Sequence, residues 1–263
     1  MGRMDLLDAE RISRWLDPEH EIEVLQEVGS TNTFLAERAA ERSVHRHLVT
    51  AEAQTAGRGR RGRHWVSPFG RNLAMTVGWE SSLPGYRLSG LSLGVGLSIH
   101  SALTSVGASS LALKWPNDVL AAGRKLCGVL VEVVSTDPTT VLVGVGVNVD
   151  LSAADRDQIA QPSADLRELG VTESRADLVG RLALALFEGL ERFEAGGFSP
   201  LAAEYVKYMA YVGEDCRVVL GDEEVLGRVV GVTPDGLLRL GCAEGERTFS
   251  GGEVSLRRLE SGR

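Results

Sequence analysis

The sequence has few of the features that mark secreted, membrane-spanning or disulfide-stabilised proteins. Only three of its 263 residues are cysteines, and their spacing gives neither a Cys-x-x-Cys pair nor an even-numbered disulfide framework. We therefore expect Cys127, Cys216 and Cys242 to be small buried or partly buried residues. No apolar run approaches the ~20 residues of a membrane helix, and residues 1–8 carry acids where a signal peptide is basic and then apolar. These absences predict a cytoplasmic protein without a membrane anchor or a cysteine-rich zinc site.

Positive charge and aromatic residues are also scarce. Lysine and arginine number 28 against 36 acidic residues, which gives a net charge of -8, and aromatic residues make up 5% of the chain. A protein of this charge repels polyanions, and its basic segments lack interleaved aromatics, so nucleic-acid binding is predicted to be excluded as its main function. The apolar content of 43% is that of an ordinary globular protein. The length suits one large domain with a small companion.

Hydrophobic periodicity predicts strands and helices mixed along the first part of the chain. Strands are expected at 21–28, 48–53, 72–79 and 111–115, in a hairpin over 119–134 that turns at 122–124, and in a continuous apolar strand at 140–149 that is typical of a central sheet position. Helices are expected at 33–41, 87–106, 174–194 and 200–209. Ser30 or Thr31 is predicted to cap the first helix, because a hydroxyl there accepts from the free amides of the first turn.

The character of the sequence changes after Gly213. Short strand-like runs alternate with Gly-Asp, Pro-Asp-Gly and Glu-Gly turns, at 216–220, 225–232, 237–240, 247–249 and 254–257. This spacing predicts a small antiparallel barrel of about 50 residues. We therefore divide the chain into a predicted larger domain at 1–209 and a smaller one at 210–263.

The segment 57–63 combines three glycines with four arginines. Its Gly-x-Gly-x-x-Gly pattern suggests a dinucleotide-binding turn, but that turn must open a helix, and Pro68 and Gly70 prevent one from following. The chain has no Gly-x-x-x-x-Gly-Lys-Ser/Thr motif of a P-loop nucleotidase. Two interpretations remain for this segment, which are a solvated charge run and a mobile clamp for a compact phosphate or carboxylate.

Several further polar residues fall at predicted strand ends or next to glycine. Each has a purely structural alternative, as a helix cap, as a turn after Pro116 or as a locally satisfied amide. Lys114 and Lys125 stand in apolar runs, where an unpaired ammonium is costly, so both need an anion nearby. The set is Ser30, Thr31, Asn32, Gln54, Lys114, Asn117, Asp118, Lys125 and Asn148.

The order of these segments resembles the biotin protein ligases, also called biotin-[acetyl-CoA-carboxylase] ligases. The matching stretches are Gly-Ser-Thr-Asn at 29–32, the segment 51–65 with its Gly/Arg loop, Leu-Lys-Trp-Pro-Asn-Asp-Val-Leu at 113–120, Arg-Lys-Leu-Cys-Gly-Val-Leu-Val-Glu at 124–132 and Val-Gly-Val-Gly-Val-Asn-Val at 143–149. Cys127 stands where the family usually has alanine. The resemblance implies an α+β fold, in which a mixed β-sheet with packed helices, like a class II aminoacyl-tRNA synthetase, precedes an SH3-like barrel.

The resemblance also implies an activity and its residues. The enzyme would activate biotin with ATP and Mg²⁺ as biotinyl-5'-adenylate and transfer it to a lysine of a biotin carboxyl carrier domain, without a metal site built from side chains. Catalytic roles would fall to Lys125, Arg58 and Asp118. Biotin would be bound by Ser30, Thr31, Asn32, Gln54, Arg58, Gly59, Arg60, Lys125 and Gly128. ATP would be bound by Arg60, Arg63, Trp65, Lys114, Asn117, Asp118 and Asn148.

Three alternatives to this activity stay open at the level of sequence. A lipoate or octanoate ligase of the same superfamily would share the fold but has no ureido ring to bind. A biotin-responsive DNA-binding repressor would need a helix-turn-helix domain, and the residues before Gly29 are too few for one. A catalytically silent biotin binder would not need Lys125. The oligomeric state, monomer or weak dimer, is left undecided.

Overall fold

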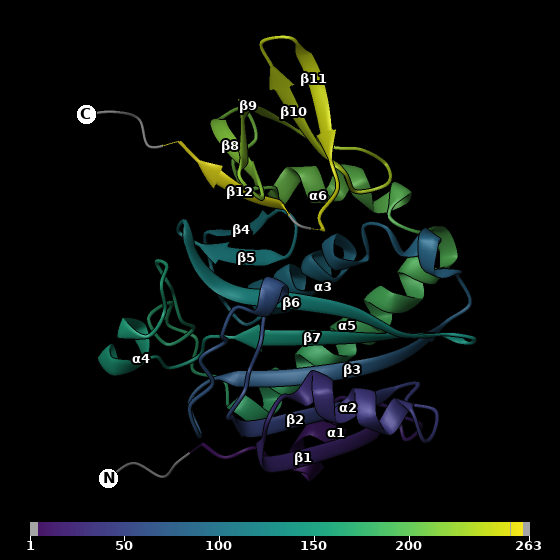
Figure 1. Ribbon diagram of the computed structural model, residues 1–263. Helices are drawn as coiled ribbons and strands as arrows, with labels where there is room; N and C mark the ends of the chain where they lie inside the picture. Colours follow the sequence, from purple (N-terminus) through teal and green to yellow (C-terminus); the bar gives the residue numbers. More distant parts are fainter. Residues whose placement is uncertain (1–4, 253, 260–263) are drawn as a thin grey trace.

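The computed structural model describes residues 5–252 and 254–259, and a seven-stranded sheet forms its centre (Figure 1). The strands lie in the order β1 (Glu21–Val28), β2 (His47–Gln54), β3 (Leu73–Ser81), β7 (Thr139–Val147), β6 (Arg124–Thr136), β5 (Asp118–Ala121) and β4 (Leu111–Lys114). β1 and β2 are parallel, and the other neighbours are antiparallel. The predicted mixed sheet is confirmed, and the apolar strand β7 occupies its middle position.

Helices cover both faces of this sheet (Figure 1). α3 (Leu91–Ser105) and α5 (Arg175–Gly196) pack together on one face, and α2 (Thr31–Ala39) packs on the other against β3 and β7. The leucine spacing of α5 places Leu178, Leu182 and Leu186 in the core, as the periodicity predicts. The remaining helical segments are α1 (Ala9–Ser13), α4 (Ala153–Asp157), α6 (Ala202–Tyr208) and the short η1 (Arg60–Gly62), η2 (Gly85–Leu88) and η3 (Ser199–Leu201).

The alternation of β7 separates the face that packs on the main core from the face that α2 covers. Val143, Val145 and Val147 point into the main core, as expected for every second residue of a strand. Gly144 and Gly146 therefore face the side of the sheet that α2 covers. The absence of side chains at these two positions leaves room above the sheet for residues of other elements.

The C-terminal part of the chain forms a second, five-stranded antiparallel sheet. Its strand order is β11 (Gly245–Phe249), β10 (Leu238–Cys242), β9 (Glu223–Val232), β8 (Asp215–Leu220) and β12 (Val254–Arg258). The predicted α+β class with a small antiparallel β module after the mixed sheet is thus confirmed. The proposed domain limit at 209/210 stays a prediction. Trp115, at the end of β4, joins the two sheets by donating from Nε1 to the carbonyl of Gly236 (3.1 Å).

The structure contains two short helices that were not predicted. α1 and α4 have five residues each, which is too short for helical periodicity to show in the sequence. Cys127 and Cys216 are buried and Cys242 is partly buried, as predicted. Among the described helices, none is long and apolar enough to cross a membrane.

Candidate functional site

The site begins where the parallel strands β1 and β2 end side by side. Val28 pairs with Gln54 in the sheet, so the turn into α2 and the side chain of Gln54 meet. Gln54 Oε1 accepts from the backbone N–H of Thr31 (2.8 Å) and from its hydroxyl (3.1 Å). The predicted hydroxyl capping is wrong in this respect: Ser30 is the N-cap residue but makes no side-chain cap bond. The amide of Gln54 instead satisfies the N–H of Thr31, the first residue of the helix.

Asn32 lies at the centre of a buried polar network between α2 and the face of β7 that carries Gly144 and Gly146. Its Oδ1 accepts from the hydroxyl of Thr76 on β3 (2.6 Å), and its Nδ2 donates to Oε2 of Glu132 on β6 (2.7 Å). Thr76 Oγ1 also lies 2.8 Å from Thr31 Oγ1. A Cβ atom on Gly144 would overlap the amide of Asn32. The glycine of β7 is therefore what allows this amide to lie flat on the sheet.

Trp65 covers the neighbouring part of the same sheet face. A Cβ atom on Gly146 would overlap its indole ring, and one on Gly128 would lie 3.4 Å from it and 3.1 Å from Lys125 Nζ. Gly146 and Gly128 are register partners on β7 and β6. The buried Nε1 of Trp65 has no hydrogen-bond partner within the part of the chain that the structure describes. A buried donor in this state is suited to a ligand acceptor.

The Gly/Arg loop forms a tight hairpin between these two regions. Gly57 O accepts from Trp65 N–H (2.9 Å), and Gly59 N–H donates to the carbonyl of Arg63 (2.7 Å). A Cβ atom on Gly57 would lie 2.7 Å from the Trp65 carbonyl, so only glycine fits there. Arg58 donates from Nη1 and Nη2 to Oε1 and Oε2 of Glu132 (2.7 and 3.1 Å). The first arginine of the loop is thus held over the Asn32 network.

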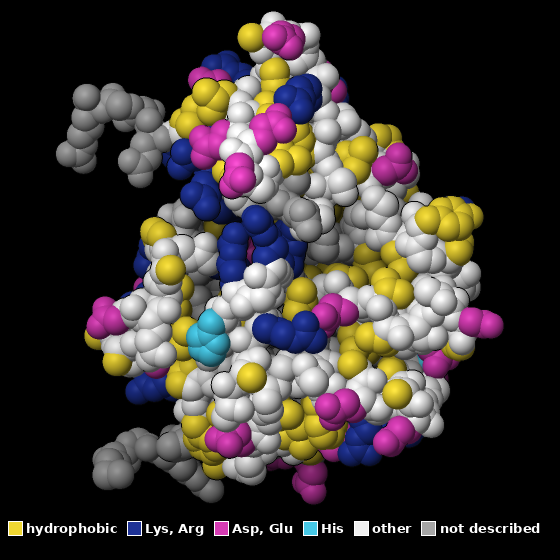
Figure 2. Space-filling model, viewed as in Figure 1, with side chains coloured by type: hydrophobic (Ala, Val, Ile, Leu, Met, Phe, Trp, Pro, Cys, Tyr) yellow, Lys and Arg dark blue, Asp and Glu magenta, His cyan; other side chains and the backbone are white. Residues whose placement is uncertain are grey.

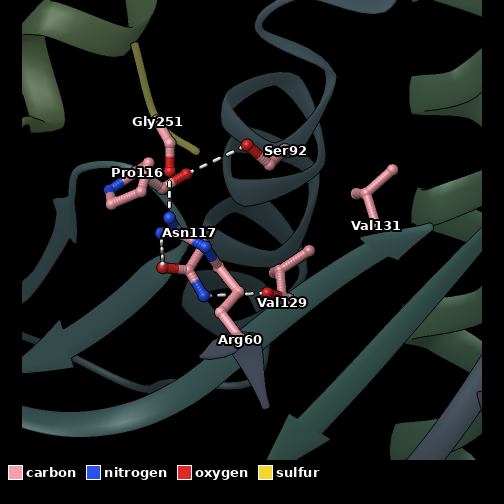
Figure 3. A pocket seen from close by; sticks show the side chains of 7 residues that line it. All are labelled: Arg60, Ser92, Pro116, Asn117, Val129, Val131 and Gly251. Atoms are coloured by element: carbon pink, nitrogen blue, oxygen red, sulfur yellow. Dashed lines mark hydrogen bonds between the residues drawn. The ribbon is translucent and has the colours of Figure 1, made fainter. Parts of the chain in front are cut away.

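Arg60 extends to the opposite side of the loop, toward the C-terminal sheet (Figure 3). Its guanidinium donates to Asn117 Oδ1 (3.0 Å) and to the carbonyls of Gly251 and Gly252, the latter at 2.6 Å. Asn117 in turn donates to the Val129 carbonyl (2.8 Å). These contacts border a hollow of about 140 Å³, lined by Arg60, Ser92, Pro116, Asn117, Val129, Val131 and Gly251.

A group of cations lies beside this hollow, where Figure 2 shows Lys and Arg side chains gathered between the two sheets. Lys125 Nζ lies 2.7 Å from Asp118 Oδ1, so Asp118 is the anion that the sequence required for this lysine. Burial lowers the pKa of Lys114, and the charges of Lys125, Arg257 and Arg63 lower it further, whereas Asp118 opposes the shift. Cations crowded in this way gain from a bound polyanion such as a triphosphate.

Asn148 has a structural position in this arrangement. Its Nδ2 donates to the backbone carbonyls of Lys125 (3.2 Å) and Ala164 (3.0 Å), and its side chain is buried. Asn148 therefore supports the end of β6 that carries Lys125, which agrees with its structural alternative as a locally satisfied amide. Its predicted contact with ATP stays untested.

The structure brings most of the predicted residues into two adjoining groups. One group is at the start of α2, and the other surrounds the Lys125–Asp118 pair. The Gly/Arg loop contacts both, because Arg58 shares Glu132 with Asn32 and Arg60 donates to Asn117. The first group is Ser30, Thr31, Asn32 and Gln54, and the second is Lys114, Asn117, Asp118 and Lys125. Thr76, Glu132 and Gly251 also belong to the site, although they were not among the predicted residues. Glu132 and Thr76 carried a usable signal, because a polar residue on the inner face of a central strand needs a buried partner.

The arrangement joins two chemically different surfaces. The network around Asn32 offers donors and acceptors fixed in place, as a small neutral polar ring requires. The cations around Lys125 provide charge for anionic groups. A ligand with a polar ring at one end and a carboxylate at the other would match both surfaces, with a polyphosphate beside the carboxylate.

Comparisons with known proteins show which family this chain resembles in sequence and fold. The sequence model of the Biotin/lipoate A/B protein ligase family matches residues 24–150, and that of the Biotin protein ligase C terminal domain matches residues 211–257. The chain is 36% identical to the "Bifunctional ligase/repressor BirA" of Salmonella typhimurium, over 98% of this chain and 80% of the relative. It is 34% identical to the "Biotin--[acetyl-CoA-carboxylase] ligase" of Mycobacterium tuberculosis, over 89% of this chain and 88% of the relative.

A solved structure shows the same architecture. The biotin protein ligase from Aquifex aeolicus in complex with biotin and ATP superposes with a TM-score of 0.77 and 29% identity, covering 91% of this chain and 99% of that one. Sequence and fold therefore agree over both sheets. The chain belongs to the biotin protein ligase family of enzymes.

Proposed function

We propose that this enzyme joins biotin to ATP, forming biotinyl-5'-adenylate and pyrophosphate, and then transfers the biotinyl group to a lysine of a biotin carboxyl carrier domain. The observation that carries the proposal is the junction of the Asn32 network and the Lys125 cation group beneath one Gly/Arg loop. The solved Aquifex aeolicus relative was obtained with biotin and ATP, which supports the same pair of substrates here.

In the first half-reaction a biotin carboxylate oxygen attacks the α-phosphorus of ATP, and the bond to the pyrophosphate leaving group breaks. Both reactants are anionic, so their approach is opposed by charge repulsion. Lys125 and Arg60 would offset this repulsion, with Lys114 and Arg63 beside them. Asn32, Thr31 and Gln54 would hold the ureido ring so that the carboxylate reaches the cation group.

In the second half-reaction a neutral lysine amine of the carrier domain attacks the acyl carbon, and AMP leaves with the electron pair of the broken anhydride bond. Water is the competing nucleophile. The hairpin at 57–65 would cover the adenylate between the two steps and exclude water. The carrier domain is proposed because a relative of this chain is named a biotin--[acetyl-CoA-carboxylase] ligase. The absence of a nucleic-acid partner stays a prediction from the net charge.

Mg²⁺ is proposed to arrive with the triphosphate. Among the described residues, no three or more His, Cys, Asp or Glu side chains form a group that would hold a metal ion. When bound to ATP the ion would neutralise phosphate charge. We assign no step of the reaction to it and attribute the remaining charge stabilisation to the lysines and arginines named above.

The proposal is tested by measuring pyrophosphate release with biotin, with lipoate and with neither. We expect pyrophosphate release only when ATP and biotin are both present. We also expect mass spectrometry to show that a carrier domain gains the mass of one biotinyl group. Lipoate is expected to be a poor substrate, because it has no ureido ring for the Asn32 network. Faster release with lipoate than with biotin would favour the lipoate-ligase alternative.

A glycine substitution tests where the ring binds. Replacing Gly144 with alanine is expected to weaken biotin binding by about 10- to 100-fold, because the new methyl displaces the Asn32 amide and overpacking of this kind costs ~1–3 kcal/mol. Titration calorimetry measures the affinity. Gly85→Ala is the matched control, since a Cβ there meets nothing within 4 Å. If Gly144→Ala and Gly85→Ala bind biotin with equal affinity, Asn32 does not bind the ring.

A further inference from the structure

Glu132 receives more polar contacts than its position in a strand requires. It lies on β6, and its two carboxylate oxygens accept both Nη groups of Arg58 and the Nδ2 of Asn32. Arg58 belongs to the Gly/Arg loop and Asn32 to the start of α2, and their side chains, which are separate in sequence, both donate to this carboxylate. The proposed reaction does not require the carboxylate of Glu132. A carboxylate here would repel the two anionic reactants.

The geometry of these contacts is specific. The paired bonds from Arg58, at 2.7 and 3.1 Å, form a bidentate guanidinium–carboxylate contact, which fixes orientation as well as distance. The side chain of Glu132 is 28% exposed and that of Arg58 is 40% exposed, so solvent weakens the charge attraction. The contact therefore contributes little to the stability of the fold, and its main effect is to hold the loop in one position.

The network continues from Glu132 into the predicted ring site. Asn32 accepts from Thr76, Thr76 contacts Thr31, and Thr31 donates to Gln54. A displacement of Glu132 would therefore disturb both the loop and the orientation of the amide at Asn32. Hydrogen-bonded networks of this kind respond as a unit.

The other end of the loop is held independently. Arg60 donates to Asn117 and to the carbonyls of Gly251 and Gly252, none of which contacts Glu132 in the described hydrogen bonds. The loop thus has two anchors, one on each group of the site. Loss of the Glu132 anchor is expected to free the half that covers the acyl end and leave the nucleotide half in place.

We infer that Glu132 is a positioning residue that latches the Gly/Arg loop, through Arg58, over the predicted ring site and so retains the activated acyl group. The inference rests on the proposed function. In this inference Arg58 binds Glu132 and not biotin, although the family resemblance placed Arg58 among the biotin-binding residues. Lys125 and Arg60 are then the cations left for the reacting groups.

Glu132→Gln tests the latch with almost no change of volume. A glutamine has one acceptor oxygen, so it cannot accept from both Arg58 and Asn32 with the original geometry. Biotinyl-adenylate formed beforehand is expected to dissociate about tenfold faster, as the loss of one charge-assisted contact predicts. Glu224→Gln, which alters the exposed pair of Glu224 with Arg217 on the C-terminal sheet, is the matched control and is expected to match wild type.

A double-mutant cycle separates a latch from a general structural defect. If the Arg58 contact carries the effect, Glu132→Gln should add less than twofold to the off-rate of Arg58→Gln. Fully additive effects would overturn the inference, as would an off-rate for Glu132→Gln equal to that of Glu224→Gln. Thermal unfolding of each variant shows whether the fold is retained.

Amide hydrogen exchange gives a readout that does not depend on biotin chemistry. Without substrates, residues 57–60 are expected to exchange faster in Glu132→Gln than in wild type, while β3 and β7 keep wild-type protection. Unchanged exchange at 57–60 would refute the latch even if the enzyme is active. If Glu132→Gln exchanges faster than wild type at 57–60 but the wild-type enzyme does not release pyrophosphate with biotin, the latch stands and the proposed function is refuted.

Discussion

Replacing Lys125 with alanine is expected to slow biotin-dependent pyrophosphate release by about 100- to 1000-fold, the loss that follows removal of one charge-stabilising group from a transition state. Lys125 is the lysine whose Nζ contacts Asp118 and lies beside Gly128 and the ring of Trp65. It is therefore next to both predicted substrate groups. Single-turnover measurement of pyrophosphate release at saturating biotin and ATP isolates the chemical step.

Lys207→Ala is the matched control for this variant. Lys207 lies on α6 with an exposed side chain, so its loss should leave the rate unchanged. Asp118→Asn adds a second test, because it removes the anion beside Lys125 and keeps the lysine. If Lys125→Ala released pyrophosphate within threefold of wild type, the lysine would have only a structural role with Asp118.

Replacing Arg175 with methionine is expected to lower the free energy of unfolding by about 3–5 kcal/mol, because it leaves a buried carboxylate without its cation. Arg175 and Glu52 have side chains that are 2% and 0% exposed, and their charged atoms lie 2.6 Å apart. Arg175 also donates to the carbonyls of Asn72 and Asp5, which would lose their donors. Urea unfolding followed by circular dichroism measures the change.

The double variant Glu52→Leu with Arg175→Met distinguishes an unpaired charge from lost packing. Removal of both charges should recover part of the stability, since a buried ion pair is often replaceable by apolar residues. Glu52 lies two residues before Gln54 on β2, so the single Arg175 variant should also weaken biotin binding. A loss below 1 kcal/mol for Arg175→Met would show that water or another cation satisfies Glu52.

The local patterns of the chain predicted its longer strands and helices and most of the residues proposed for the site, but not α1 and α4, nor Thr76, Glu132 and Gly251. The alternation of β7 placed valines in the core and glycines on the site face, because successive residues of a strand point to opposite faces. The spacing of leucines defined α5, and the turn at 122–124 follows from Ala122 and Gly123, both at positive φ. These features depend on neighbours in sequence, so the sequence determined them by itself.

The pairing of these residues was decided by the tertiary structure. The cap of α2 comes from Gln54 and not from a hydroxyl, because the parallel pairing of β1 with β2 brings that amide to the first turn. Glu132 reaches Asn32 and Arg58 only because β6 follows β7 and β3 in the sheet. Gly251 meets Arg60 because the second sheet packs beside the first. Contacts across such sequence separations depend on strand order and packing, which no local pattern of residues specifies.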